Sequence, residues 1–121
     1  MASVRYLVHD VDAAVNFYVG QLGFALEQRW GPPFAIVACD GLKLWLSGPG
    51  SSASRPLPDG RQPAPGGWNR LVIEVEDVAA LVERLRSVGI RTRSEIVTGP
   101  GGSQVLVDDP SGNPVELFQP G

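Results

Sequence analysis

An internal repeat limits what this chain can fold into more than any other feature of its sequence. Two segments, 10–23 and 77–89, carry apolar residues at helical spacing. Each segment begins at an aspartate, Asp10 or Asp77, and these two candidate N-caps lie 67 positions apart. Each ends at a glycine that suits a helix C-terminus, Gly23 or Gly89. The chain is therefore predicted to contain one supersecondary unit built twice.

Strand-like segments flank both predicted helices in the same order. An alternating apolar segment precedes each helix, and three further segments follow it, separated by turns rich in glycine, proline and aspartate. The predicted strands are 4–8, 24–30, 34–39 and 42–46 in the first half, and 71–75, 91–98, 103–107 and 115–118 in the second. The fold class expected is α+β, with two tandem βαβββ modules.

The segment between the two halves has a different composition from either half. Of its 21 residues, 47–67, 14 are glycine, proline or serine. We therefore expect a first module at 1–46, an exposed linker at 47–67 and a second module at 68–121, forming one compact domain overall. The linker is either a solvated spacer or a lid over a pocket mouth.

Composition excludes several classes of protein. The chain has 121 residues, of which 43% are hydrophobic and 19% charged, which is typical of a globular domain. Its longest apolar runs fall short of the ~20 residues that span a bilayer, and its N-terminus does not resemble a signal peptide. The net charge is −3 with no basic block, so no nucleic-acid or membrane partner is expected. A cytoplasmic location is expected, and the bias to alanine, arginine, glycine and proline suits a GC-rich bacterial genome.

Strand periodicity separates the side chains into two faces, because successive residues point to opposite sides. One face is aliphatic and is expected to pack on the helices. The other mixes aromatic and charged residues, as expected of a ligand-accommodating concavity. The aliphatic set is Leu42, Leu44, Leu46, Leu71, Ile73, Val75, Val115 and Leu117. The mixed set is Lys43, Trp45, Ser47, Trp68, Arg70, Val72, Glu74, Glu116 and Phe118.

Motifs in both halves resemble the vicinal oxygen chelate superfamily, which includes glyoxalase I, extradiol dioxygenases and bleomycin-resistance proteins. In the first half these residues are Asp10, Phe17, Tyr18, Leu22, Gly23 and Phe24. In the second half they are the segment 109–117, Asp-Pro-Ser-Gly-Asn-Pro-Val-Glu-Leu. The resemblance implies curved mixed sheets around a cup, with the helices outside. It also implies a homodimer with cups at or near the interface.

Metal-dependent members of the superfamily have four metal ligands, and the resemblance implies that the matching positions in this chain are occupied by Ser3, Trp45, Arg70 and Glu116. Only Glu116 suits a divalent ion, because tryptophan cannot ligate and an arginine repels a cation. We therefore expect no metal and no other cofactor.

The remaining candidates form a ligand-binding set rather than a metal site. The set is Trp30, Lys43, Trp45, Trp68, Arg70, Glu116 and Phe118. Arg70 and Glu116 either contact a ligand or only neutralise each other inside the fold. Trp30 is either a rim residue or a structural one. His9 is a candidate general base or a turn residue, and Cys39 is expected to be an inert thiol.

Three functions remain open at this point. The first is a metal-free binding protein of the bleomycin-resistance type, which would sequester a bulky, aromatic, antibiotic-like molecule. The second is a glyoxalase-like lyase or isomerase, or a dioxygenase-related enzyme, that would use Glu116 as its acid–base group. The third is a structural or regulatory domain whose cup is filled by its own side chains.

Overall fold

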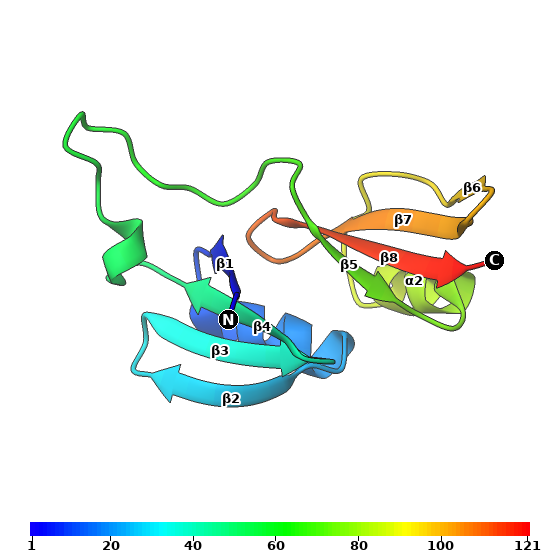
Figure 1. Cartoon of the computed structure of the whole chain (residues 1–121), viewed down its shortest axis with the longest axis horizontal. Helices are drawn as coiled ribbons and strands as arrows, with labels where there is room; N and C mark the ends of the chain where they lie inside the picture. The colour runs from blue at the N-terminus through cyan, green and yellow to red at the C-terminus, as the bar shows by residue number, and fades with distance from the viewer. The chain divides into compact units, whose positions relative to one another are not determined.

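The computed structural model describes all residues, 1–121, and divides into two compact units, Met1–Pro65 and Gly66–Gly121 (Figure 1). In the first unit, β1 (Val4–Leu7) leads into α1 (Val11–Val15) and the π-helical turn η1 (Asn16–Gln21). Then follow β2 (Ala25–Trp30), β3 (Phe34–Cys39), β4 (Leu42–Ser47) and the 3₁₀ turn η2 (Ser52–Ser54). No helix is long and apolar enough to cross a membrane.

The second unit repeats this order of elements. It contains β5 (Leu71–Glu74), α2 (Val78–Ser87), β6 (Val97–Gly99), β7 (Gly102–Asp108) and β8 (Pro114–Pro120). The sheet orders are β1-β4-β3-β2 and β5-β8-β7-β6, each with one parallel pair and two antiparallel pairs. Two mixed four-stranded sheets, each with its helix, confirm the predicted α+β repeat.

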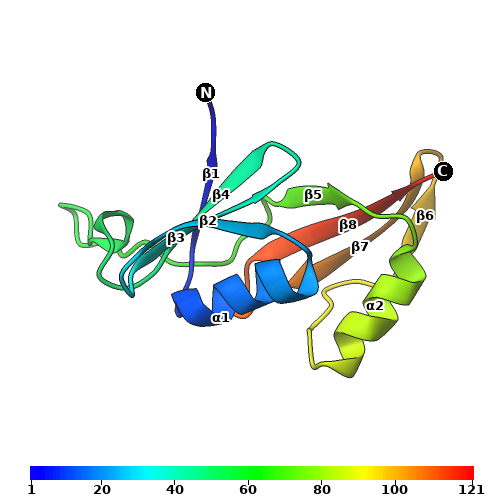
Figure 2. The ribbon, with the colours of Figure 1, turned by 90° about the horizontal axis from the view of Figure 1, so that it is seen from below.

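Each helix covers one face of its own sheet (Figure 2). In the first unit, Ala35, Val37, Leu44 and Leu46 are fully buried on that face. In the second, Val105, Val107, Val115 and Leu117 pack with Val82 and Leu85 of α2. Of the predicted aliphatic set, Leu44, Leu46, Leu71, Val115 and Leu117 are buried in the core, whereas Leu42, Ile73 and Val75 are only half-buried. Val88, the last apolar residue of the predicted helical segment 77–89, is 54% exposed, because α2 ends at Ser87.

Both helices begin at the predicted caps. The Asp10 carboxylate accepts the Ala13 N–H at 3.2 Å, and the Asp77 carboxylate accepts the Ala80 N–H at 3.0 Å. Gly23 and Gly89 have φ of 78° and 86°, the left-handed conformation that ends a helix at little cost for glycine.

The Asp77 cap gives a simple stability prediction. Asp77→Ala should lower the free energy of unfolding by about 1 kcal/mol, because the Ala80 N–H loses its acceptor. Urea unfolding followed by circular dichroism measures the change. Glu83→Ala, on the exposed surface of the same helix, is the matched control and should change stability by less than about 0.5 kcal/mol. An equal loss in both variants would contradict the capping role.

Two predicted elements differ in the structure. The first helix is α-helical only to Val15 and continues as a π turn, in which the Leu22 N–H bonds to the Phe17 carbonyl. The wider turn brings the adjacent Phe17 and Tyr18 side chains into the core, 3% and 0% exposed, with their rings edge to face.

The strand predicted at 91–98 is also wrong, since only Val97–Gly99 forms β6 and Thr92 makes a single bridge to Val107. The Ser94 hydroxyl accepts the Leu106 N–H at 3.1 Å in place of a strand carbonyl. The backbone of Arg91 and Arg93 still bonds to Asp108 and Leu106 of β7, so the ladder stops at Ser94, where the hydroxyl takes the place of the carbonyl.

Candidate ligand-binding site

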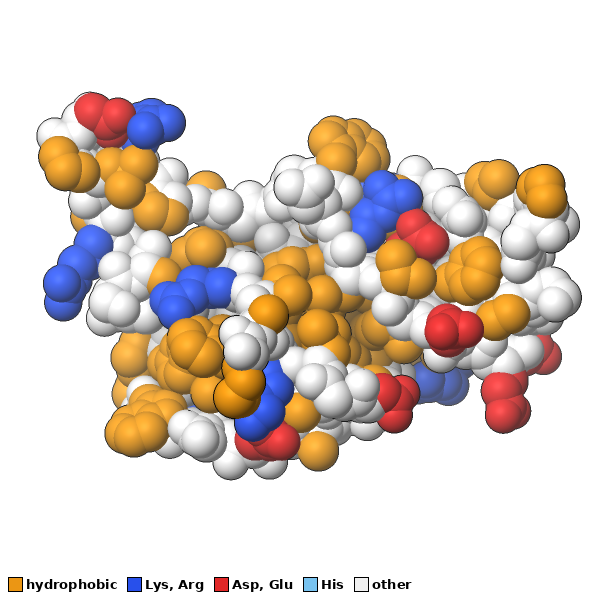
Figure 3. Space-filling model, viewed as in Figure 1, with side chains coloured by type: hydrophobic (Ala, Val, Ile, Leu, Met, Phe, Trp, Pro, Cys, Tyr) orange, Lys and Arg blue, Asp and Glu red, His pale blue; other side chains and the backbone are white.

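The first sheet has a face directed away from α1, which we call the first open face. Cross-strand neighbours share a face, and the register pairs Arg5 with Trp45, Trp45 with Ile36 and Phe34 with Trp30. The first open face therefore carries Arg5, Gln28, Trp30, Phe34, Ile36, Lys43 and Trp45. In Figure 3, hydrophobic side chains gather over β3 and β4 with basic side chains among them.

Trp45 lies at the centre of this face. The Phe34 ring meets it edge to face, with centroids 5.8 Å apart, and the Arg5 guanidinium lies 5.1 Å from its ring centroid. Trp45 borders two pockets, one of about 330 Å³ beside Met1 and Ser3 and one of about 420 Å³ beside Trp30 and Phe34. A flat ligand bound in either pocket could therefore stack against the Trp45 ring.

The other two predicted residues of this face lie nearer its edge. Lys43 forms an ion pair with Glu27 at 3.1 Å. Trp30 is 64% exposed, and its Nε1–H donates to the Gln28 side chain at 2.9 Å. Trp30 therefore borders the larger of the two pockets as a rim residue, while the Lys43 charge is already paired.

The second sheet has a corresponding face directed away from α2, which we call the second open face. Its register places Val72 opposite Glu116, Glu116 opposite Leu106, and Phe118 opposite Gln104. Glu116 is only 8% exposed, and its Oε1 accepts two hydrogen bonds from Arg70, from Nη2 at 2.8 Å and from Nε at 3.0 Å. The predicted Arg70 and Glu116 are therefore brought together as a charge-assisted pair beside the half-buried Phe118.

Arg93 is a residue of this face that sequence reasoning missed. Its guanidinium lies 4.8 Å from the ring centroid of Trp68, which is itself 69% exposed. The same side chain bonds to Asp108 at 2.6 Å and to the Gly67 and Gly112 carbonyls at 2.7 and 2.8 Å. Arg93 thus backs one face of the Trp68 ring. No sequence signal marks it, because its partners come from three separate segments.

The residues at the four family metal positions do not fit a divalent ion. The registers make Ser3 equivalent to Arg70 and Trp45 equivalent to Glu116. Arg70 already donates twice to Glu116, and neither Trp45 nor Arg70 can ligate a metal. No group of three or more His, Cys, Asp or Glu side chains lies together in the structure.

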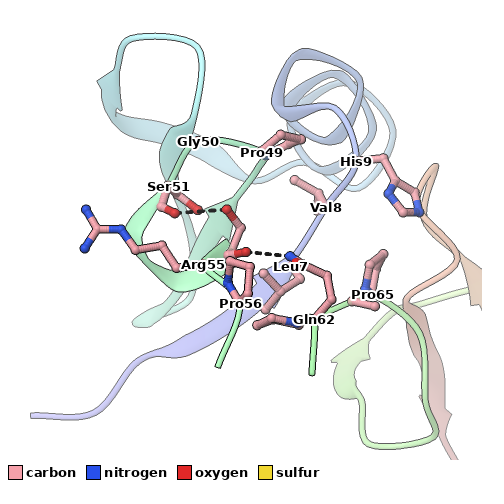
Figure 4. A pocket seen from close by; sticks show the side chains of 13 residues that line it. Leu7, Val8, His9, Pro49, Gly50, Ser51, Arg55, Pro56, Gln62 and Pro65 are labelled. Carbon is pink, nitrogen blue, oxygen red and sulfur yellow. Dashed lines mark hydrogen bonds between the residues drawn. The ribbon is translucent and has the colours of Figure 1, made fainter. Parts of the chain in front are cut away.

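His9 and Cys39 are not part of either open-face centre. His9 is exposed and borders a separate pocket of about 640 Å³, lined mainly by prolines, glycine and serine from the segment after β4 (Figure 4). Burial, with the neighbouring Asp40 carboxylate, raises the pKa of the Cys39 thiol. The raised pKa disfavours the reactive thiolate, consistent with an inert cysteine.

The chain matches one known protein family over almost its whole length. The model of the Glyoxalase/Bleomycin resistance protein/Dioxygenase superfamily matches residues 1–117. No curated protein matches the chain. Among solved structures, TnmS3, an antibiotic binding protein from Streptomyces sp. CB03234, is 27% identical with a TM-score of 0.68, and the match covers 100% of this chain and 97% of that one.

Two further solved structures show the same fold at lower identity. Lactoylglutathione lyase from Agrobacterium tumefaciens is 23% identical with a TM-score of 0.73, and the match covers 98% of this chain and 92% of that one. The fosfomycin resistance protein FosX from Listeria monocytogenes is 13% identical with a TM-score of 0.75, covering 100% and 93%. The fold is therefore shared by proteins with different chemistry.

Proposed function

The chain belongs to the Glyoxalase/Bleomycin resistance protein/Dioxygenase superfamily, and from this premise we propose that it is a metal-free binding protein that sequesters a bulky aromatic, antibiotic-like molecule. The observation that carries the proposal is Trp45, a central aromatic ring bordering two pockets on the first open face. The likeness to TnmS3, described as an antibiotic binding protein, supports it. Aromatic stacking and exclusion of water supply affinity without any reaction.

The state of Glu116 favours binding over proton transfer. Its Oε1 accepts two hydrogen bonds from Arg70, which hold the carboxylate in one orientation and leave only Oε2 to accept a substrate proton. A general base needs a free acceptor within reach of the substrate proton. The alternative, a lyase, isomerase or dioxygenase-related enzyme using Glu116, therefore ranks second.

A retention experiment tests the proposal directly. The purified protein is incubated with a panel of aromatic antibiotics and metabolites, filtered, and the retained molecules are weighed by mass spectrometry. Sequestration predicts retention at unchanged mass. Retention of no aromatic compound at micromolar concentration would contradict the proposal. A mass change that depends on the protein and disappears in Glu116→Gln would establish the enzymatic alternative.

Substitutions at the two tryptophans test the open faces separately. Trp45→Ala should weaken binding of the retained compound about tenfold or more, since stacking on an aromatic side chain contributes about 0.5–1.5 kcal/mol beyond its area burial. Trp45→Phe should retain most of the affinity, because it keeps a ring. Trp68→Ala tests the second open face in the same way, because weaker binding in this variant would place the compound against Trp68.

Isothermal titration calorimetry gives the affinities, and an exposed residue outside both faces supplies the control. Val88→Ala, at the end of α2, should bind as the unsubstituted protein does. Unchanged affinity in both tryptophan-to-alanine variants would remove the open faces from the site, even if the protein retains a ligand.

We also propose that the protein is a homodimer with its ligand sites at or near the interface. The open faces expose large apolar side chains, Trp30, Trp68 and Val72 among them, which is common at surfaces that meet a partner. Light scattering on the purified protein should give twice the chain mass of 12.9 kDa. A single-chain mass at micromolar concentration would contradict the dimer.

A further inference from the structure

Among the basic side chains of the first unit, one on the first open face has no ion pair. Arg29, Lys43 and Arg61 each pair with a carboxylate, at 2.7, 3.1 and 2.8 Å. Arg5 and Arg55 have no such partner. Arg55 is one of the residues that line the pocket beside His9, and its guanidinium extends away from the other labelled residues (Figure 4). Arg5 is therefore the one basic side chain on the candidate binding face that has no ion pair.

The position of Arg5 links its charge to the aromatic centre of the site. Its guanidinium lies 5.1 Å from the Trp45 ring centroid, and Arg5 borders both of the pockets that Trp45 borders. A guanidinium held over an indole keeps its edge N–H groups free for an anion, because the ring contacts only its flat face. A ligand in either pocket would meet an aromatic surface and a cation together.

The same face also has donors without acceptors. The indole Nε1–H of Trp45 and the hydroxyl of Ser47 are buried and have no hydrogen-bond partner. Ser47 lies two residues from Trp45 on β4, so both side chains point to the same side of the sheet. Unpartnered buried polar groups are unusual and call for an explanation. The Trp45 indole can only donate, whereas the Ser47 hydroxyl can donate or accept, so Trp45 and Arg5 are the donors that an anionic group near the centre of this face would meet.

We propose that the ligand taken up by the first open face is a planar aromatic molecule carrying an anionic group, such as a carboxylate. The aromatic ring contacts Trp45, and the anionic group accepts hydrogen bonds from Arg5. This inference rests on the proposed binding function and makes it specific. A cationic aromatic ligand is disfavoured, because it would meet the unpaired Arg5 charge.

Two probes of the same shape and different charge test the inference. 2-Naphthoate and 2-naphthamide share a ring system and differ in whether the substituent is anionic. Calorimetric titration of the full chain should show 2-naphthoate binding about tenfold more tightly, since hydrogen bonds to a charged group are the stronger kind. The preference should weaken as salt is raised.

Arg5 variants locate the origin of the preference. Arg5→Gln should reduce the preference for 2-naphthoate to less than about twofold, while Arg5→Lys should keep part of it. Arg91→Gln removes the same charge from an exposed arginine of the second unit that has no ion pair, and it should leave the preference unchanged. The indole resonances in a nitrogen–proton correlation spectrum provide a second readout. The signal assigned to Trp45 by Trp45→Phe should shift with 2-naphthoate in the unsubstituted protein and shift less in Arg5→Gln.

The outcomes separate this inference from the function on which it rests. Equal binding of both probes would overturn the anionic ligand, and a preference that survives Arg5→Gln would overturn the role of Arg5. Either result would leave aromatic binding intact. Failure of both probes to bind at millimolar concentration, together with no retained compound in the panel, would overturn the binding function as well.

Discussion

Leu44→Ala is expected to lower the free energy of unfolding by about 3 kcal/mol, the middle of the range for leucine-to-alanine changes at fully buried positions. Leu44 is fully buried in β4, between Val4 of β1 and Val37 of β3. Removal of its side chain leaves a cavity between the sheet and α1 that rigid neighbours cannot fill. The loss is therefore the transfer free energy of the missing atoms plus the cost of that cavity.

The same substitution in the same sheet supplies the control. Leu26 lies in β2 at the sheet edge and is 47% exposed, so Leu26→Ala should cost less than about 1 kcal/mol. Urea unfolding followed by tryptophan fluorescence and by circular dichroism compares the two, with Trp30 and Trp45 reporting on the first unit. Similar losses in both variants would mean that the packing of β4 on α1 does not determine the stability of this unit.

Arg70→Met is expected to lower the free energy of unfolding by about 2 kcal/mol. Arg70 donates both hydrogen bonds to Oε1 of Glu116, a carboxylate that is 8% exposed. Removing the arginine leaves a largely buried charge without its partner, which costs more than the pair contributes while it is intact. Arg70 itself is partly exposed, so water offsets some of the loss.

A double substitution separates the loss of the pair from the loss of packing. Arg70→Met/Glu116→Gln should be more stable than Arg70→Met alone, because it removes the uncompensated charge. Arg61→Met breaks an exposed pair with Asp59 and should change stability by less than about 0.5 kcal/mol. If Arg70→Met and Arg61→Met cost the same in urea unfolding, Glu116 does not depend on Arg70 for its burial.

Local patterns in the sequence were sufficient for the repeat, the helix starts and the inner faces of the sheets. Asp10 and Asp77 cap helices because a carboxylate can reach an N–H three residues on, which is a short-range effect. The alternation in β4 predicts that Leu44 and Leu46 are core and that Trp45 is on the opposite face, because side chains in a strand alternate strictly.

Interactions between distant segments were decided only by the tertiary structure. Arg93 meets Gly67, Asp108 and Gly112, and the Ser94 hydroxyl replaces a backbone carbonyl within the strand predicted at 91–98. The sequence placed Trp45 on the mixed face without indicating that Arg5, 40 positions away in the chain, lies over its ring.

Residues within one turn or one strand lie at distances that the local backbone geometry sets, so their contacts can be predicted from the sequence pattern alone. Residues on different strands meet only after the register is fixed, and the register depends on the packing of the whole core. The sequence by itself therefore determined the repeated architecture of this protein and its candidate tryptophans. Which charged and hydrogen-bonding residues surround those tryptophans was decided by the tertiary structure.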